Sequence, residues 1–207
     1  MSEEYPTQEP RRPKDEATVA QALEGMDNTF DRIAARLYSL ASMLVGEGED
    51  SIRLVETAVA TAEVPSFSSA EDARRSSRLA LATAAVELIA NRNTESLAAP
   101  EALEPAVTCI EDDDLDAAAE AREAMERMIA GPDRDRVRAW LESLPTALRT
   151  IYVLRAVAEL TTAETAELLA AHGGPLALEW TPDQVRELFR QGLCSLASQL
   201  IHATTRD

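Results

Sequence analysis

Residues 144–169, LPTALRTIYVLRAVAELTTAETAELL, hold the pattern that decides the fold. From Leu148 onward, apolar residues recur at steps of three and four, the period of a helix with one buried face. Thr161 stands three residues before Glu164, which is the spacing of a capping box at the start of a helix. The stretch therefore predicts two consecutive helices, the second beginning just after Thr161.

Residues 181–203, TPDQVRELFRQGLCSLASQLIHA, predict a third and longer helix. Thr181 is a favoured cap, and Pro182 suits the first helical position because it has no amide hydrogen to leave unpaired. The ten residues before it, AHGGPLALEW at 171–180, end the second helix at their glycines and contain no further recognisable element. The stripe predicted to be buried contains Val185, Leu188, Phe189, Leu193, Leu196 and Leu200.

The N-terminal half contains three more amphipathic stretches, at residues 26–45, 50–64 and 70–93. The sequence GEGED separates the first two, and Asp50 or Ser51 is expected to cap the second helix. The first stripe contains Phe30, Ile33, Leu37, Leu40, Ala41 and Leu44. The second contains Ile52, Val55, Val59 and Ala62, with Leu54 and Ala58 beside them. The third contains Leu79, Ala82, Val86 and Ile89.

The composition favours a protein built from helices alone. Apolar residues make up 45% of the 207 positions and aromatic residues only 4%, and no stretch alternates as a strand would. We therefore expect an all-α fold of two small helical domains, at 25–97 and 133–207. A disordered tail at 1–24 precedes them, and an acidic linker at 98–132 joins them. The expected aromatic anchors of the core are Trp140, Trp180 and Phe189.

The charge is strongly negative and unevenly distributed. The formal net charge is -17, and eleven of the 37 acidic residues lie within residues 95–126, where Arg122 is the single base. From residue 127 to residue 207 the acids and bases nearly balance, at ten and nine. Phosphate contacts supply much of the affinity of a protein for DNA, so a nucleic-acid surface is more plausible in this last part than in the central belt.

Several classes of function find no support in the sequence. No catalytic motif, phosphate-binding loop or metal-ligand spacing is present, so we expect no enzyme activity, cofactor or metal. Cys109 and Cys194 lack redox or metal spacing and are interpreted as two free thiols in a reducing cytoplasm. The start of the chain is polar and no run of eighteen apolar residues occurs, which predicts a cytoplasmic protein without a membrane segment.

The C-terminal stretch resembles the helix-turn-helix domain of extracytoplasmic-function sigma factors, the small initiation subunits of bacterial RNA polymerase. The matching positions are Leu144-Pro145, Arg149, Leu154-Arg155, Leu160-Thr161, Glu164, Ala166, Glu167 and Leu169. The helix from Thr181 resembles the recognition helix of that family, with Val185-Arg186 in place of its Val-Lys pair. Residues 171–180 are an insertion relative to the tight turn of the family.

The N-terminal half resembles the other domain of the same family. GEGEDSIRLVETAV is similar to the helix that docks on a coiled coil of core polymerase, and RLALATAAVELIANRN is similar to the helix that faces the upstream promoter element. The resemblance implies promoter contacts by Thr181, Gln184, Arg186 and Arg190, and by Arg74, Arg75, Arg78 and Arg92. It implies polymerase docking by Asp50, Leu54, Val55 and Glu56. It also implies core RNA polymerase, promoter DNA and an anti-sigma or other regulatory protein as partners.

A second interpretation fits the same residues. Arg186 and Arg190 lie within reach of Asp183 and Glu187 on their own helix and would then be solvated, paired arginines. The acidic belt would be a solvating linker rather than a segment that threads through polymerase. The alternative function is therefore a degenerate sigma-fold interaction module that has lost promoter binding and acts through protein partners.

Overall fold

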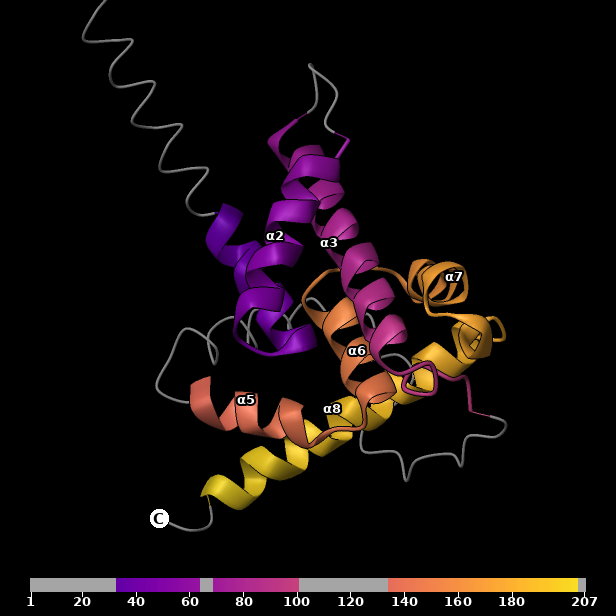
Figure 1. Ribbon diagram of the computed structural model, residues 1–207. Helices are drawn as coiled ribbons and strands as arrows, with labels where there is room; N and C mark the ends of the chain where they lie inside the picture. The colour runs from indigo at the N-terminus through magenta and orange to yellow at the C-terminus, as the bar shows by residue number, and fades with distance from the viewer. Residues whose placement is uncertain (1–32, 64–68, 101–133, 205–207) are drawn as a thin grey trace, which may run out of the picture. The chain divides into compact units, whose positions relative to one another are not determined.

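The computed structural model describes residues 33–63, 69–100 and 134–204 (Figure 1). Every regular element in these ranges is helical, and none of them is a strand, so the predicted all-α class is confirmed. The predicted tail at 1–24 and most of the predicted linker at 98–132 lie outside the described residues. From Leu37 onward, the described residues form one compact unit.

The first described helix, over residues 33–45, ends at a turn that contains two glycines. Gly46 and Gly48 have φ angles of 88° and 138°, in a region that residues with a side chain rarely adopt. Gly48 precedes α2, Glu49–Thr61, as its N-cap. The prediction of a cap at Asp50 or Ser51 is therefore wrong: the Ser51 side chain is buried, and its hydroxyl donates to the Gly46 carbonyl within the turn.

Helices α2 and α3, Ala70–Arg92, contact each other along their lengths. A capping box in which Ser69 and Asp72 exchange hydrogen bonds begins α3, so this helix starts where its local sequence directs it. Together with residues 37–45, these helices contribute one set of core side chains. The set contains Leu37, Leu40, Ala41, Leu44, Leu54, Ala58, Leu81, Ala82, Ala85, Val86 and Ile89.

The predicted inward faces of α2 and α3 are partly wrong. Ile52 and Val59 are 51% and 63% exposed, whereas Leu54 and Ala58 are buried. Leu79 of α3 is also exposed. The apolar stripe of α2 is wider than one neighbouring helix can cover, and the sequence period does not state which of its edges is packed.

The C-terminal helices are α5, Arg134–Ser143, α6, Thr146–Ala156, α7, Thr162–His172, and α8, Pro182–Thr204. Both α6 and α7 contact α8, and α3 contacts α7. The predicted aromatic anchors are confirmed, because Trp140, Trp180 and Phe189 are all buried. The predicted stripe of α8 is confirmed at Val185, Leu188 and Phe189.

An aromatic cluster fixes the crossing of α6 and α8. The Tyr152 ring meets the Trp140 ring edge-on at a centroid distance of 5.0 Å and lies 5.6 Å from the Phe189 ring. The Trp140 indole nitrogen donates to the Ser195 hydroxyl at 3.0 Å, which satisfies its buried polar atom. Gly192 makes the close approach possible, because a Cβ there would lie 2.6 Å from Cδ2 of Tyr152.

The insertion at 171–180 is ordered. It contains a short 3-10 helix, η2, Pro175–Ala177, and the start of the predicted linker packs against it. The Trp180 indole nitrogen donates to the Leu97 carbonyl at 2.9 Å, and the Ala99 amide donates to the Leu176 carbonyl at 3.0 Å. The insertion therefore joins the end of the α3 segment to the α7–α8 segment.

Cys194, on α8, is disulfide-bonded, so the prediction of a free thiol at this position is wrong. The other cysteine of the chain, Cys109, lies outside the described residues. Sequence spacing did not reveal the bond because a disulfide requires proximity in space and not along the chain. None of the helices in the described ranges is sufficiently long and apolar to cross a bilayer.

We predict that Gly192→Ala destabilises the protein, although alanine is normally the better helix former by about 1 kcal/mol. The new methyl group would press on the Tyr152 ring, and such overpacking typically costs about 1–3 kcal/mol. Urea denaturation would measure the loss. Ser198→Ala, at an exposed position of the same helix, serves as the control and is expected to leave stability nearly unchanged. Equal stability of Gly192→Ala and wild type would contradict the close packing.

Candidate functional site

Thr181 and Gln184 cap the start of α8, which is the end of this helix predicted to face DNA. The Thr181 amide donates to Oε1 of Gln184 at 2.9 Å, and the Gln184 amide donates to the Thr181 hydroxyl at 3.3 Å. The Gln184 side chain also donates to the Pro100 carbonyl at 3.0 Å. Gln184 is therefore engaged at both ends of its amide, whereas Thr181 is exposed at the tip of the helix.

The two arginines of α8 differ in accessibility. Nη1 of Arg186 lies 2.7 Å from Oδ1 of Asp183, and the Arg186 side chain remains 48% exposed. Nη1 of Arg190 lies 3.4 Å from Oε2 of Glu187, and its side chain is only 14% exposed. Both arginines therefore pair with the carboxylates of their own helix that the second interpretation of the sequence named. Arg186 is the cation of this pair that a ligand in solvent could reach.

Arg155, on α6, contacts both α8 and the segment between α6 and α7. Its guanidinium lies 5.2 Å from the centre of the Phe189 ring, and Nη1 donates to the Leu160 carbonyl at 2.5 Å. Burial lowers its pKa, and the nearby positive charge of Arg186 lowers it further. Arg155 therefore holds the chain between α6 and α7 and adds positive potential beneath α8. The sequence motif contained this arginine but did not indicate its contacts.

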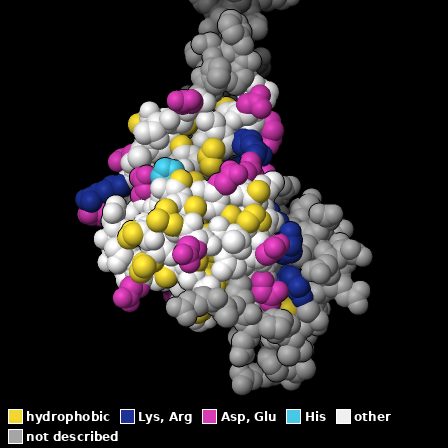
Figure 2. Space-filling view, turned by 90° about the vertical axis from the view of Figure 1, so that its right-hand side faces the viewer, with side chains coloured by type: hydrophobic (Ala, Val, Ile, Leu, Met, Phe, Trp, Pro, Cys, Tyr) yellow, Lys and Arg dark blue, Asp and Glu magenta, His cyan; other side chains and the backbone are white. Residues whose placement is uncertain are grey.

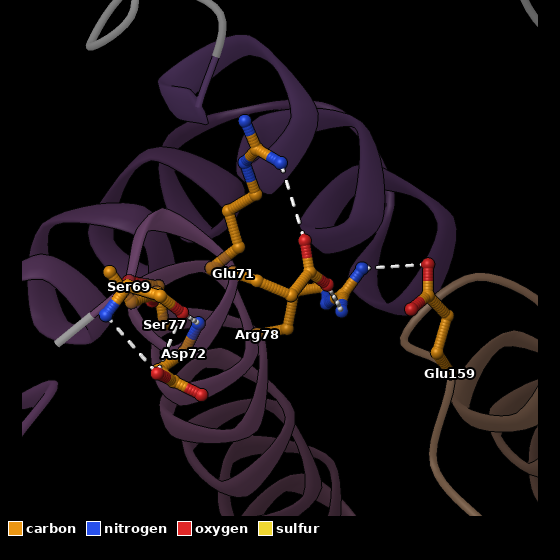
Figure 3. Close-up of polar contacts among 8 residues, drawn as sticks. Ser69, Glu71, Asp72, Ser77, Arg78 and Glu159 are labelled. Atoms are coloured by element: carbon orange, nitrogen blue, oxygen red, sulfur yellow. Dashed lines mark hydrogen bonds and ion pairs between the residues drawn. The ribbon is translucent and has the colours of Figure 1, made fainter.

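The four predicted DNA-contacting arginines of α3 all pair with carboxylates. Arg74 Nη1 lies 3.3 Å from Glu71, within the same helix. Arg78 Nη1 lies 2.7 Å from Oε1 of Glu159, which belongs to the segment between α6 and α7 (Figure 3). The remaining pairs are Arg75 with Glu164 and Arg92 with Asp50.

The face of the molecule around α7 has few bases. In Figure 2 the visible arginine side chains lie at the edges of the described surface, while hydrophobic, Asp and Glu side chains are scattered across it. Leu176 and Leu178 of the insertion are exposed large apolar residues. On this face, the cations that an anionic ligand could reach are the arginines at its edges.

The predicted docking residues occupy three different environments. Leu54 is 4% exposed and belongs to the core, so it cannot meet a partner unless α2 moves. Asp50 pairs with Arg92, and Val55 is half-buried. Glu56 is exposed. The apolar groups that α2 does offer to a partner are Ile52 and Val59, which the docking motif did not single out.

The capping box predicted at Thr161 and Glu164 is confirmed. The Thr161 amide donates to Oε2 of Glu164 at 2.7 Å, and the Glu164 amide donates to the Thr161 hydroxyl at 3.1 Å. The pKa of Glu164 is lowered, first by the Thr161 amide and hydroxyl and then by Arg75. One carboxylate therefore caps α7 and also pairs with α3.

The comparisons with known proteins add no relative, because no family model, curated protein or solved structure matches this chain.

We predict that Glu164→Ala lowers the free energy of unfolding by about 1 kcal/mol at neutral pH, the usual cost of a lost cap. The pKa of this carboxyl is lower in the folded protein, so its stabilisation is complete above the ordinary glutamate pKa. It is lost as the pH falls through the folded value. Urea denaturation over this acid range should show the difference between wild type and variant shrinking. Glu167→Ala, exposed on the same helix, is the control; a difference that is independent of pH would contradict the assignment.

Proposed function

We propose that this protein is a sigma-factor-like initiation protein that docks on bacterial core RNA polymerase through α2 and contacts promoter DNA through α8 and α3. The resemblance of both halves of the sequence to extracytoplasmic-function sigma factors, in the right order, motivates the proposal. The observation that carries it is the exposed apolar row on α2, which lies in the segment that resembles the docking helix.

This row has the properties of a protein-binding surface. Ile52 and Val59 lie seven residues apart, so they occupy the same side of the helix about two turns from each other. Both are exposed, and the half-buried Val55 lies between them. Glu49 and Glu56 follow the same spacing and are exposed. A partner helix with an apolar seam and basic residues at its border would complement this surface.

The DNA-binding part of the proposal relies on the start of α8. Thr181 and Arg186 are exposed there, and the helix N-terminus itself favours an anionic group such as a phosphate. The ordered insertion precedes this end and holds it through Trp180. Arg186 is therefore the side chain that we expect to contact the phosphate backbone or a base edge.

A second candidate function is an interaction module that binds protein partners and not DNA. The paired state of Arg75, Arg78 and Arg92 favours it, because a carboxylate already occupies the place that a phosphate would take. The burial of Arg190 has the same effect. In this function the α2 row would still bind a protein, and α8 would serve as a scaffold.

Ile52→Asp and Val59→Asp are each expected to weaken binding to purified core RNA polymerase about tenfold or more, because a charge replaces an apolar contact near the centre of the interface. Pull-down of core polymerase over a concentration series would measure the change. Leu178→Asp makes the same substitution at an exposed site of the insertion and should leave binding intact. If wild type shows no saturable binding, the initiation function is rejected.

Arg186→Gln is expected to weaken binding to promoter DNA and to reduce the slope of log affinity against log salt by about one phosphate contact. Fluorescence anisotropy at several salt concentrations would give both quantities. Arg53→Gln removes the same charge from an exposed position of α2 and is the control. Equal effects of the two substitutions would mean that net charge alone is responsible and that Arg186 makes no specific contact.

A further inference from the structure

Two cationic side chains of α3 are held by carboxylates from the C-terminal segment. Arg78 pairs with Glu159, and Arg75 pairs with Glu164. The Arg78 side chain is 20% exposed and the Glu159 side chain 28%, so solvent screens this contact less than an ordinary surface pair. Arg75 and Arg78 lie three residues apart, on neighbouring positions of one helix face. These four residues, called the clasp below, join α3 to the start of α7.

Other contacts bring the same two segments together. His172 Nδ1 lies 2.8 Å from Oε1 of Glu87, which connects the end of α7 to α3. The Ala99 amide donates to the Leu176 carbonyl, so a main-chain hydrogen bond also spans the junction. The clasp is thus the charged end of a larger contact between segments that are far apart in the sequence.

Glu159 lies in a left-handed turn just after α6, and its carboxylate reaches from this turn to α3. Glu159 has a φ angle of 62°, and it is the one residue other than glycine with a positive φ in the part of the chain described. This conformation is unfavourable for a residue with a Cβ, and glycine or asparagine would adopt it more easily. Glutamate at this position offers no advantage to the turn itself. Its carboxylate, however, reaches Arg78.

We infer that the clasp is an autoinhibitory contact that covers the nucleic-acid surface of α3. Carboxylate and phosphate compete for the same guanidinium fork, because both accept paired hydrogen bonds from arginine. In the closed state, Glu159 and Glu164 occupy Arg78 and Arg75. When the junction opens, both arginines become available to the DNA backbone. The inference rests on the proposed function, since it assigns a regulator to the DNA surface of that function.

The test uses two variants that break the same ion pair from opposite sides. Glu159→Asn removes the carboxylate, leaves Arg78 in place and suits the left-handed backbone, so the protein should remain folded. Arg78→Gln breaks the pair but removes the cation. Glu71→Gln is the matched control, because Glu71 pairs with Arg78 and Arg74 within α3 and does not span the junction.

Two measurements on the full-length protein separate opening from DNA binding. Hydrogen exchange at the Ala99 amide reports opening, since its acceptor lies across the junction. Fluorescence anisotropy with a labelled duplex DNA of mixed sequence reports binding. Both Glu159→Asn and Arg78→Gln should speed the exchange. Only Glu159→Asn should tighten DNA binding, by about two- to fivefold, as expected for one partly exposed ion pair. Glu71→Gln should not speed the exchange.

The outcomes separate a failed clasp from a failed function. Unchanged exchange in Glu159→Asn overturns the inference. Faster exchange with unchanged DNA affinity, in a protein that still binds core polymerase, also overturns it and leaves the proposed function standing. If neither the wild type nor Glu159→Asn binds core polymerase or DNA, the proposed function itself is rejected.

Discussion

The contact of the Tyr152 ring with Gly192 is the constraint on which the C-terminal part of this structure depends. It lets α6 and α8 cross closely enough for Trp140 and Phe189 to pack on the same ring. The position of Phe189 then gives the Arg155 guanidinium a surface to lie on, and Arg155 holds the Leu160 carbonyl just before the α7 cap. The start of α7, the turn at Glu159 and the accessible end of α8 are therefore linked through one aromatic cluster.

Most arginines of the candidate surface form ion pairs with Asp or Glu side chains. With a net charge of -17, acids are in excess, and most arginines of the candidate surface have a carboxylate within reach. Exposed pairs contribute little stability, so their main effect here is on what else the arginines can bind. A protein with this surface binds an anionic partner only by exchanging one acceptor for another. The net charge alone therefore does not distinguish an initiation protein that binds promoter DNA from an interaction module that binds only proteins.

Local sequence predicted the helices and their starts well, and it predicted long-range contacts poorly. The Thr161–Glu164 box and the buried stripe of α8 follow from spacing, because caps and helix faces depend on residues within a few positions of one another. The glycine turn before α2 was missed because Asp50 and Ser51 looked like better caps than Gly48. The pairing of Arg78 with Glu159 could not be foreseen, since it depends on how α3 meets α7.

The hydrogen bond from Trp180 to Leu97 has a consequence for the order of folding. It joins residues that are far apart in the chain, and the Ala99–Leu176 bond does the same, whereas the hydrogen bonds within the described helices join residues only a few positions apart. Local contacts form quickly and long loops close slowly, so the helices are expected to form before this junction does. During synthesis the α3 segment emerges before the insertion exists. The Leu97 carbonyl, Arg75 and Arg78 therefore meet their C-terminal partners only after the last third of the chain has been made, whereas Arg74 and Arg92 have their carboxylates from the start.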